Sequence, residues 1–201
     1  MKIILVGASG TIGTAVKALF ESQGHEVLPA SRNGKLSVDI RDAASIQHMF
    51  ATHGPVDMVV STAGDALYGD IRDLDDEQWE VGLKSKLMGQ INLVRYGRAN
   101  THIGFILTGG ALAYSPWPRT SAIATVNAAI EGFVKGAAAD LRHEKRVVVV
   151  HPPLLSETAQ HMGMDPSKFP GADEVARTYL DALNSDSTGT AFFLDGYPPR
   201  R

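Results

Sequence analysis

The sequence predicts a single α/β domain in which a doubly wound, mostly parallel sheet of seven strands carries helices on both faces. Two observations predict this fold. Short runs rich in Val, Ile and Leu alternate with helix-length segments from end to end, and no repeat, low-complexity tract or linker divides the 201 residues. A chain of this length fits one domain with an ample core, so we expect the domain to span residues 1–201.

Each expected element is one of these two kinds of segment. Strands are expected at residues 2–6, 26–30, 36–38, 56–60, 103–107, 146–150 and 190–194. Helices are expected at 11–23, 42–52, 75–99 with a possible break, 120–143 and 172–183. Asp42 and Asp173 stand where N-cap or first-turn acidic residues belong, and Gly24 closes the first helix. The proline-rich stretch 152–171 is expected to be a long loop over the carboxyl ends of the strands, where such sheets bind ligands.

The composition restricts the class of protein. Hydrophobic residues make up 44% of the chain, and 19 Lys and Arg against 22 Asp and Glu give a net charge of −3. No basic excess therefore predicts binding to nucleic acid or to an anionic membrane. The chain has no cysteine, which excludes thiolate chemistry, and its seven histidines lack ligand spacing, so we expect no metal site. Because the start does not resemble a signal peptide and no apolar run could span a bilayer, we expect a cytoplasmic protein.

The segment 2–13 predicts a phosphate-binding turn between the first strand and the first helix. Gly7 lets the chain turn sharply, Gly10 lets the backbone approach a pyrophosphate, and Gly13 lets the helix pack closely on the strand. The free N–H groups of the helix start would hold the anion. The other expected cofactor contacts of this turn are Ser9, Thr11 and Ile12. A glycine-rich turn without a ligand is the alternative, but the strand before it and the amphipathic run after it favour a Rossmann-type dinucleotide site.

The end of the second strand indicates which dinucleotide is bound. About 20 residues past the turn, a carboxylate would bond a ribose 2′-hydroxyl, whereas an arginine accommodates a 2′-phosphate. Ser31 and Arg32 stand there, which favours NADP over NAD. An exposed loop arginine without a role is the alternative. Asp39, with Ile40 beside it, would contact the adenine edge or begin the following helix.

With this turn, Asp39, the segment Ser61-Thr62-Ala63-Gly64, the helical Lys86-Leu87-Met88-Gly89 and Pro152-Pro153, the chain resembles the short-chain dehydrogenase/reductase superfamily over nearly its whole length. The resemblance implies a nicotinamide-dependent oxidoreductase that acts on a small carbonyl or alcohol. It adds cofactor contacts at Thr62, Ala63, Gly64, Lys86, Pro152 and Leu155. It also implies a homodimer or homotetramer, assembled through helices at 87–100 and 120–143. The small residues of the second of these helices fit either a subunit interface or packing on its own sheet.

The residues that carry the chemistry of this superfamily are replaced. Its usual Tyr and Lys fall on Ile123 and Asn127, its usual Ser falls near Gly110, and no Tyr-x-x-x-Lys occurs anywhere in the chain. The superfamily also carries an asparagine on the preceding helix, and Lys86 stands at that position here. Lys and Asn have thus exchanged places across the expected nicotinamide ribose.

This exchange keeps catalysis open as a hypothesis. Lys86 would reach the ribose hydroxyls with Asn127 as its partner, while Tyr114 or Thr108 would supply the proton. The alternative is a solvent-facing Lys86. A general-acid role for His151 is a further hypothesis, and Glu157 stands at the family's usual threonine. Two functions therefore remain: an NADP(H)-dependent oxidoreductase with non-standard catalytic residues, and a catalytically silent NADP(H)-binding sensor or interaction module. A polar group within reach of the substrate would favour the oxidoreductase. An apolar wall of Ile123, Leu112 and Leu155 would favour the sensor.

Overall fold

The structure is a computed structural model that describes residues 1–142 and 144–197. Residue 143, the last of the helix expected at 120–143, lies outside the described residues, as do 198–201 of the expected domain. The seven strands form one sheet, and they are β1 (Lys2–Val6), β2 (Glu26–Ser31), β3 (Leu36–Ser37), β4 (Val56–Ser61), β5 (Thr101–Thr108), β6 (Arg146–His151) and β7 (Ala191–Phe193). Their order is β3-β2-β1-β4-β5-β6-β7 and every pair is parallel.

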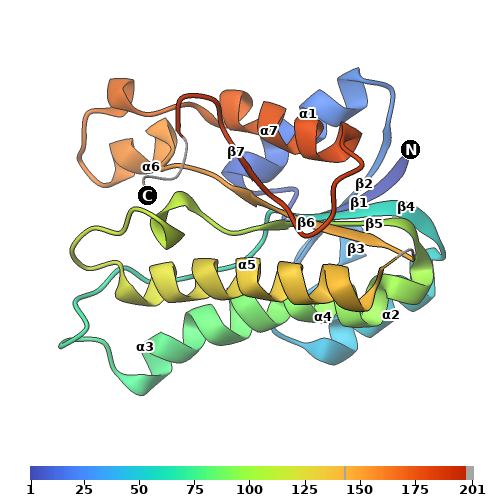
Figure 1. Cartoon of the computed structure of the whole chain (residues 1–201), viewed down its shortest axis with the longest axis horizontal. Coiled ribbons are helices and arrows are strands. Elements are labelled where there is room, and N and C mark those ends of the chain that lie inside the picture. The colour runs from blue at the N-terminus through green and yellow to red at the C-terminus, as the bar shows by residue number, and fades with distance from the viewer. Residues whose placement is uncertain (143, 198–201) are drawn as a thin grey trace.

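Helices cover both faces of this sheet, as Figure 1 shows. One face packs against α1 (Thr11–Ser22) and α7 (Ala172–Asn184), and the other against α2 (Ala43–His53), α4 (Met88–Gly97) and α5 (Ser121–Asp140). Side chains of the strands alternate between these two apolar layers because successive residues point to opposite faces. The expected Rossmann-type fold, with its doubly wound sheet, is confirmed.

The helical region expected at 75–99 contains the break that its sequence indicated. It consists of α3 (Asp76–Val81), a π-helical segment η1 (Gly82–Leu87), α4, and a short 3-10 turn η2 (Arg98–Asn100). A capping box begins it, because the Asp75 carboxylate accepts from the Gln78 N–H and the Gln78 side chain accepts from the Asp75 N–H. The π-helical turn is the break, and it carries Lys86.

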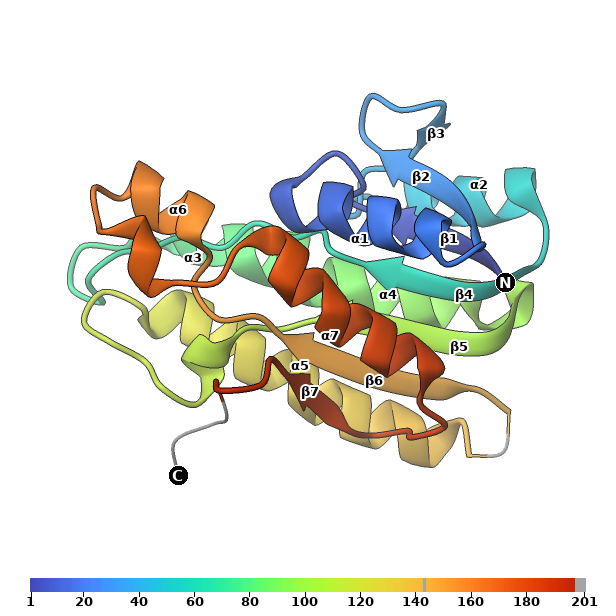
Figure 2. The ribbon, with the colours of Figure 1, turned by 90° about the horizontal axis from the view of Figure 1, so that it is seen from above.

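The stretch 152–171 is more ordered than the expected loop. It contains α6 (Ser156–His161) and a 3-10 turn, η4 (Pro166–Lys168). The Ser156 N–H donates to the Pro170 carbonyl at 2.8 Å, and this hydrogen bond joins the two ends of the stretch. Figure 2 shows that α6 lies beyond the carboxyl ends of the strands, which is where we expected this segment.

The remaining sequence expectations concern helix ends and membrane spans. Asp42 caps α2 by accepting from the Ala44 N–H, and Gly24, at φ +79°, follows the C-terminus of α1. Asp173 lies in the first turn of α7. Another short 3-10 turn, η3 (Ala111–Ala113), follows β5. No helix in the described part of the chain has the length and hydropathy of a membrane span.

Candidate cofactor-binding and active site

The glycine turn after β1 is tightly packed at two of its three glycines. Gly7 has φ +85°, and a Cβ there would lie 2.8 Å from the Ala63 backbone nitrogen. At Gly13 a Cβ would come within 2.1 Å of the Gly7 carbonyl oxygen. At Gly10 the nearest atom would be that same oxygen, at 3.4 Å, so the side of the turn away from the protein is open. Backbone contact thus explains Gly7 and Gly13, whereas ligand approach is the role left for Gly10.

The N-terminus of α1 faces this open side and has no acidic residue in its own first turn, although Glu157 and Asp173 line a second cavity together with Gly10 and Thr11. Gly10 is the N-cap and provides no side-chain cap, and the first turn has no acidic residue. The N–H groups at the start of a helix have no intrahelical acceptor, and the helix dipole makes this end positive. The backbone of Thr11 and Ile12 therefore offers donors to an anion.

A cavity of about 240 Å³ lies between the glycine turn and the ends of β2, β3 and β4. Ten predicted cofactor residues line it, namely Gly7, Ser9, Gly10, Ser31, Arg32, Asp39, Ile40, Thr62, Ala63 and Gly64. Thr11, Ile12, Gly13, Lys86, Pro152 and Leu155 do not line this cavity. Sequence reasoning missed five lining residues, the apolar Val6 and Val38 and the polar Arg41, Asp65 and Ser85.

Thr62 ties the end of β4 to the glycine turn. Its N–H donates to the Val6 carbonyl at 2.9 Å, and its Oγ1 lies 3.2 Å from the carbonyl oxygens of both Val6 and Gly7. The hydroxyl therefore adds to the backbone pairing of β1 with β4.

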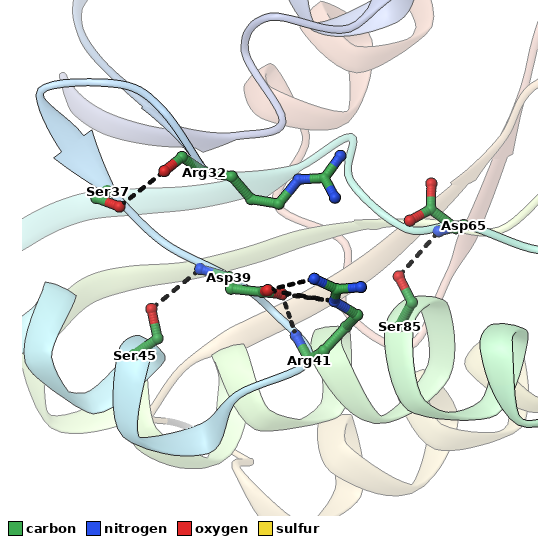
Figure 3. A network of polar contacts seen from close by, with 7 residues as sticks. All are labelled: Arg32, Ser37, Asp39, Arg41, Ser45, Asp65 and Ser85. Atoms are coloured by element: carbon green, nitrogen blue, oxygen red, sulfur yellow. Dashed lines mark hydrogen bonds and ion pairs between the residues drawn. The ribbon is translucent and has the colours of Figure 1, made fainter.

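Polar side chains gather at the far end of the cavity (Figure 3). Asp39 does not begin a helix, because α2 is capped by Asp42; its carboxylate instead accepts from Arg41. The hydrogen bonds from the Arg41 side chain lower the pKa of Asp39. Arg32 extends from the end of β2 toward the same space. The Asp65 N–H donates to Ser85 Oγ at 3.0 Å.

Two of the replaced catalytic positions, Gly110 after β5 and Asn127 on α5, are in direct contact. A Cβ built at Gly110 would come within 2.6 Å of Asn127 Nδ2. Asn127 is almost wholly buried, and its Oδ1 has no hydrogen-bond partner among the described residues. Buried polar atoms are nearly always paired. Within the described residues, the Oδ1 of Asn127 therefore lacks the partner that buried polar atoms usually have.

Lys86 is partly buried rather than solvent-facing. Its side chain packs on Gly64, where a Cβ would lie 2.8 Å from Lys86 Cγ, and its carbonyl accepts from Gln90 Nε2 at 3.2 Å. Burial lowers the pKa of Lys86 to about 8. The π-helical segment that carries Lys86 packs on α5, where a Cβ at Gly82 would lie 3.2 Å from Val126. No hydrogen bond joins Lys86 to Asn127 in the part of the chain that the structure describes.

The two expected proton donors have other partners. Thr108 Oγ1 donates to the Ser61 carbonyl at 2.5 Å and lies 2.6 Å from the Tyr179 hydroxyl. The Tyr114 hydroxyl donates to Glu131, and burial, followed by the Glu131 carboxylate, raises the pKa of this tyrosine. Neither hydroxyl is free to serve a substrate in this arrangement.

His151 belongs to a cluster that sequence reasoning did not assemble. Its ring stacks on Phe193 with centroids 5.3 Å apart, and Tyr114 meets its edge at 5.4 Å. Nδ1 lies 2.9 Å from the Gly110 nitrogen, while Nε2 lies 3.3 Å from the Glu131 carboxylate. Burial lowers the pKa of His151. The cluster supports the Gly110 turn from behind. In the sequence, the only indication of this cluster was the position of His151 at the end of an expected strand.

The α6 segment holds its position through Glu157. One oxygen of this carboxylate accepts from the Ala172 N–H at 3.0 Å and the other from Ser156 Oγ at 3.0 Å. Leu155 is buried in the core, and the Pro152 carbonyl accepts from the Ala111 N–H at 2.9 Å. Glu157 therefore joins α6 to the start of α7.

Fold and site together define a Rossmann-type α/β protein with a cavity at the carboxyl ends of its strands. Residues 2–178 match the model of the family described as enoyl-(acyl carrier protein) reductase. The chain belongs to this family, within the short-chain dehydrogenase/reductase superfamily of oxidoreductases.

Individual relatives cover almost the whole chain. The structure of the protein lin1944 from Listeria innocua is 34% identical, with a TM-score of 0.90 over 96% of this chain and 99% of that one. A small-chain dehydrogenase in complex with NADPH is 27% identical, with a TM-score of 0.87 over 98% and 97%. The 2,3-dihydro-2,3-dihydroxybenzoate dehydrogenase of Bacillus subtilis (strain 168) is 29% identical over 90% of this chain and 79% of its own length.

Proposed function

We propose that this protein is an NADP(H)-dependent oxidoreductase in which Lys86 replaces the missing proton-transfer residues of its superfamily. The observation that carries the cofactor assignment is the single cavity shared by the glycine turn and Arg32. The relative whose structure contains NADPH supports the same assignment, because it matches 98% of this chain.

Residues of this chain fit the cofactor along its length. The open N-terminus of α1 suits the pyrophosphate, since its first turn contains no acidic residue. Arg32 and Ser31 suit a 2′-phosphate, because a guanidinium pairs with phosphate through two parallel hydrogen bonds. The unpaired Oδ1 of Asn127 suits a hydroxyl donor such as that of the nicotinamide ribose. Thr62, Ala63, Gly64, Pro152 and Leu155 complete the contacts that we propose.

Reduction of a carbonyl needs a hydride, which NADPH supplies when bound, and a proton at the oxygen. We assign the proton to Lys86, because the hydroxyls of Tyr114 and Thr108 are committed to Glu131 and Ser61. A pKa of about 8 makes the Lys86 ammonium a better acid near neutral pH than an ordinary lysine. Asn127 would orient the ribose opposite Lys86.

The names of the relatives and of the matching family support a small carbonyl, alkene or alcohol as substrate. Our proposal keeps to a carbonyl or alcohol. We further propose a cytoplasmic homodimer or homotetramer, without a nucleic-acid or membrane partner. Exposed Leu83 and Met88, on the outer side of the η1 and α4 region, support an interface there.

The activity is tested with a panel of carbonyl substrates, by following the loss of NADPH absorbance. We expect turnover by the wild type, and we expect Lys86→Met to lower kcat by about a hundredfold while changing the Kd of NADPH by less than about threefold. Lys84→Met, on the exposed side of the same segment, is the matched control. Full kcat in Lys86→Met would contradict the assignment of the proton.

A specific observation also favours the second candidate, a sensor that binds NADP(H) without turnover. Gly110 and Ile123 place a hydrogen atom and an apolar side chain where the superfamily has hydroxyl groups. A sensor would be stabilised by NADPH in thermal unfolding, because a ligand of the native state alone raises stability. It would show no turnover on any substrate of the panel.

A further inference from the structure

Gln90 is a buried polar residue to which the proposed function assigns no role. It lies on α4, one helical turn after Lys86, and its exposed fraction is 0%. Removing a polar side chain from water is unfavourable unless its polar atoms find hydrogen-bond partners in the protein. The partners of the Gln90 amide therefore indicate what this residue does.

The Gln90 side chain pairs with the end of β5 as a neighbouring strand would. The pairing of β4 with β5 ends at Val60 and Ile106, so the backbone of Thr108 extends past the last paired residues of β4. The Thr108 N–H donates to Gln90 Oε1 at 2.7 Å, and Gln90 Nε2 donates to the Thr108 carbonyl at 2.8 Å. One side chain thus satisfies both backbone groups of a buried residue.

The same amide also holds the π-helical turn. Gln90 Nε2 donates to the Lys86 carbonyl at 3.2 Å, in addition to the Thr108 carbonyl. A carboxamide has two N–H donors and one acceptor oxygen, so these three hydrogen bonds use both donors and the oxygen. Gln90 therefore connects the turn that carries Lys86 to the end of β5.

This connection bears on where the Lys86 side chain lies. A π-helix is bonded from residue i to i+5 rather than i+4, so a return to ordinary α-helical winding would rotate Lys86 about the axis of its segment. Lys86 now packs on Gly64, a residue of the cavity wall, where a Cβ would lie 2.8 Å from Lys86 Cγ. Such a rotation would move the Lys86 side chain away from this wall.

We propose that Gln90 is the positioning residue of Lys86, whose carboxamide holds the π-helical turn against the end of β5 and so keeps the Lys86 side chain on Gly64. The inference rests on the proposed function, in which Lys86 delivers the proton. Gln90 does not line the cavity, and its amide is occupied by Thr108 and by the Lys86 carbonyl. It therefore acts on the reaction only through the place of Lys86.

The first test measures the titration of Lys86 without substrate or cofactor. Acetic anhydride acylates only neutral amines, so mass spectrometry follows the acylation of Lys86 against pH, with the exposed Lys84 as internal reference. Burial lowers the pKa of Lys86 to about 8 in the wild type. We expect Lys86 in Gln90→Met to titrate at least about one pH unit higher, because the released side chain reaches water.

Tyr179→Phe is the matched control, because it removes a buried hydrogen bond at the same strand end without touching Lys86. The Tyr179 hydroxyl lies 2.6 Å from Thr108 Oγ1, and Tyr179 is wholly buried. Both variants should unfold at lower urea concentration than the wild type, but only Gln90→Met should move the titration of Lys86. Gln90→Asn, whose amide is one methylene shorter and cannot reach Thr108 and Lys86 together, should behave like Gln90→Met and supplies the same readout if that variant does not fold.

Turnover on the carbonyl panel gives the second readout. We expect Gln90→Met to lower kcat by about tenfold and to leave the Kd of NADPH within about threefold of the wild type. The pH at which kcat falls on the alkaline side should move upward with the titration of Lys86, because the ammonium is the acid. Tyr179→Phe should leave this pH unchanged.

Two results would overturn the proposal. An unchanged titration of Lys86 in the Gln90 variants, whatever their stability, would show that Gln90 supports only the fold. An equal shift in Tyr179→Phe would show that Lys86 responds to any loosening of the strand end. Because the titration needs no turnover, an inactive wild type, which would overturn the proposed activity, leaves this readout intact.

Discussion

Asn127 occupies the space that a side chain at Gly110 would need, since a Cβ there would lie 2.6 Å from Asn127 Nδ2. Asn127 falls on the lysine of the superfamily's catalytic set, and Gly110 lies at or next to the position of its serine. The two departures from the family pattern are therefore one packing arrangement. His151 completes it on the other side of the turn, where Nδ1 lies 2.9 Å from the Gly110 nitrogen.

Restoring the family's serine should therefore fail unless Asn127 changes too. We expect Gly110→Ser to lower the free energy of unfolding by about 1–3 kcal/mol, the usual cost of overpacking a buried site. Asn127→Ala opens the space, so the double variant should lose less than the sum of the two single variants. Urea unfolding of the four proteins measures this coupling. Additive losses would show that the two side chains do not compete for space.

The glycine turn gives a prediction about close packing. A methyl group at Gly13 would meet the Gly7 carbonyl oxygen at 2.1 Å, so Gly13→Ala should destabilise the protein by at least about 1 kcal/mol and weaken NADPH binding. Gly136→Ala is the matched control, because it also lies in a helix and no atom lies within 4 Å of its Cβ position. It should stabilise the protein by up to about 1 kcal/mol. Equal effects of the two variants in urea unfolding would argue against a tightly packed turn.

The lowered pKa of Lys86 predicts how stability depends on pH. The folded protein releases this proton at about 8, whereas the unfolded chain keeps it up to the ordinary value of 10.5. Between these values the unfolded state binds more protons, so the wild type gains stability as pH rises. Lys86→Met lacks this gain. Its free energy of unfolding relative to the wild type should therefore fall as pH rises from about 8 to about 10.5, as measured in urea. A difference that stays constant over this interval would mean that Lys86 is not desolvated.

Tyr114 gives a prediction that separates support from catalysis. Because its hydroxyl donates to the Glu131 carboxylate, Tyr114→Phe should cost about 1–2 kcal/mol of unfolding free energy and leave kcat within about threefold. Tyr96→Phe, whose hydroxyl makes no hydrogen bond within residues 1–142 and 144–197, is the control. A loss of kcat of about a hundredfold in Tyr114→Phe, with NADPH binding intact, would return the proton to Tyr114.

The sequence predicted the features that depend on local patterns. The strands, the glycine turn and the cap of α2 follow from residue type and spacing, and they are where we expected them. The π-helical turn at Lys86 was indicated only as a break, since it depends on the packing of this segment on Gly64 and α5. Helix α6 was missed because four prolines surround it.

The candidate site was predicted less completely than the fold. The ten predicted residues that line the cavity belong to motifs that follow β1, β2, β3 and β4. These strands are neighbours in the sheet, so their ends meet at one edge. Arg41 was missed because its place in the cavity depends on its hydrogen bonds to Asp39. We had interpreted Asp39 as an adenine contact or as the start of a helix. The contact of Gly110 with Asn127 joins elements far apart in the sequence, and no local pattern reveals it.

The central claim is that the cavity beside Arg32 binds NADP(H) in preference to NAD(H). Fluorescence titration of the wild type and Arg32→Asp with NADPH and NADH tests it most directly. We predict that the wild type binds NADPH at least about tenfold more tightly than NADH, and that Arg32→Asp abolishes this difference by weakening NADPH alone. Equal affinities of the wild type for both cofactors, or a preference that survives Arg32→Asp, would contradict the account.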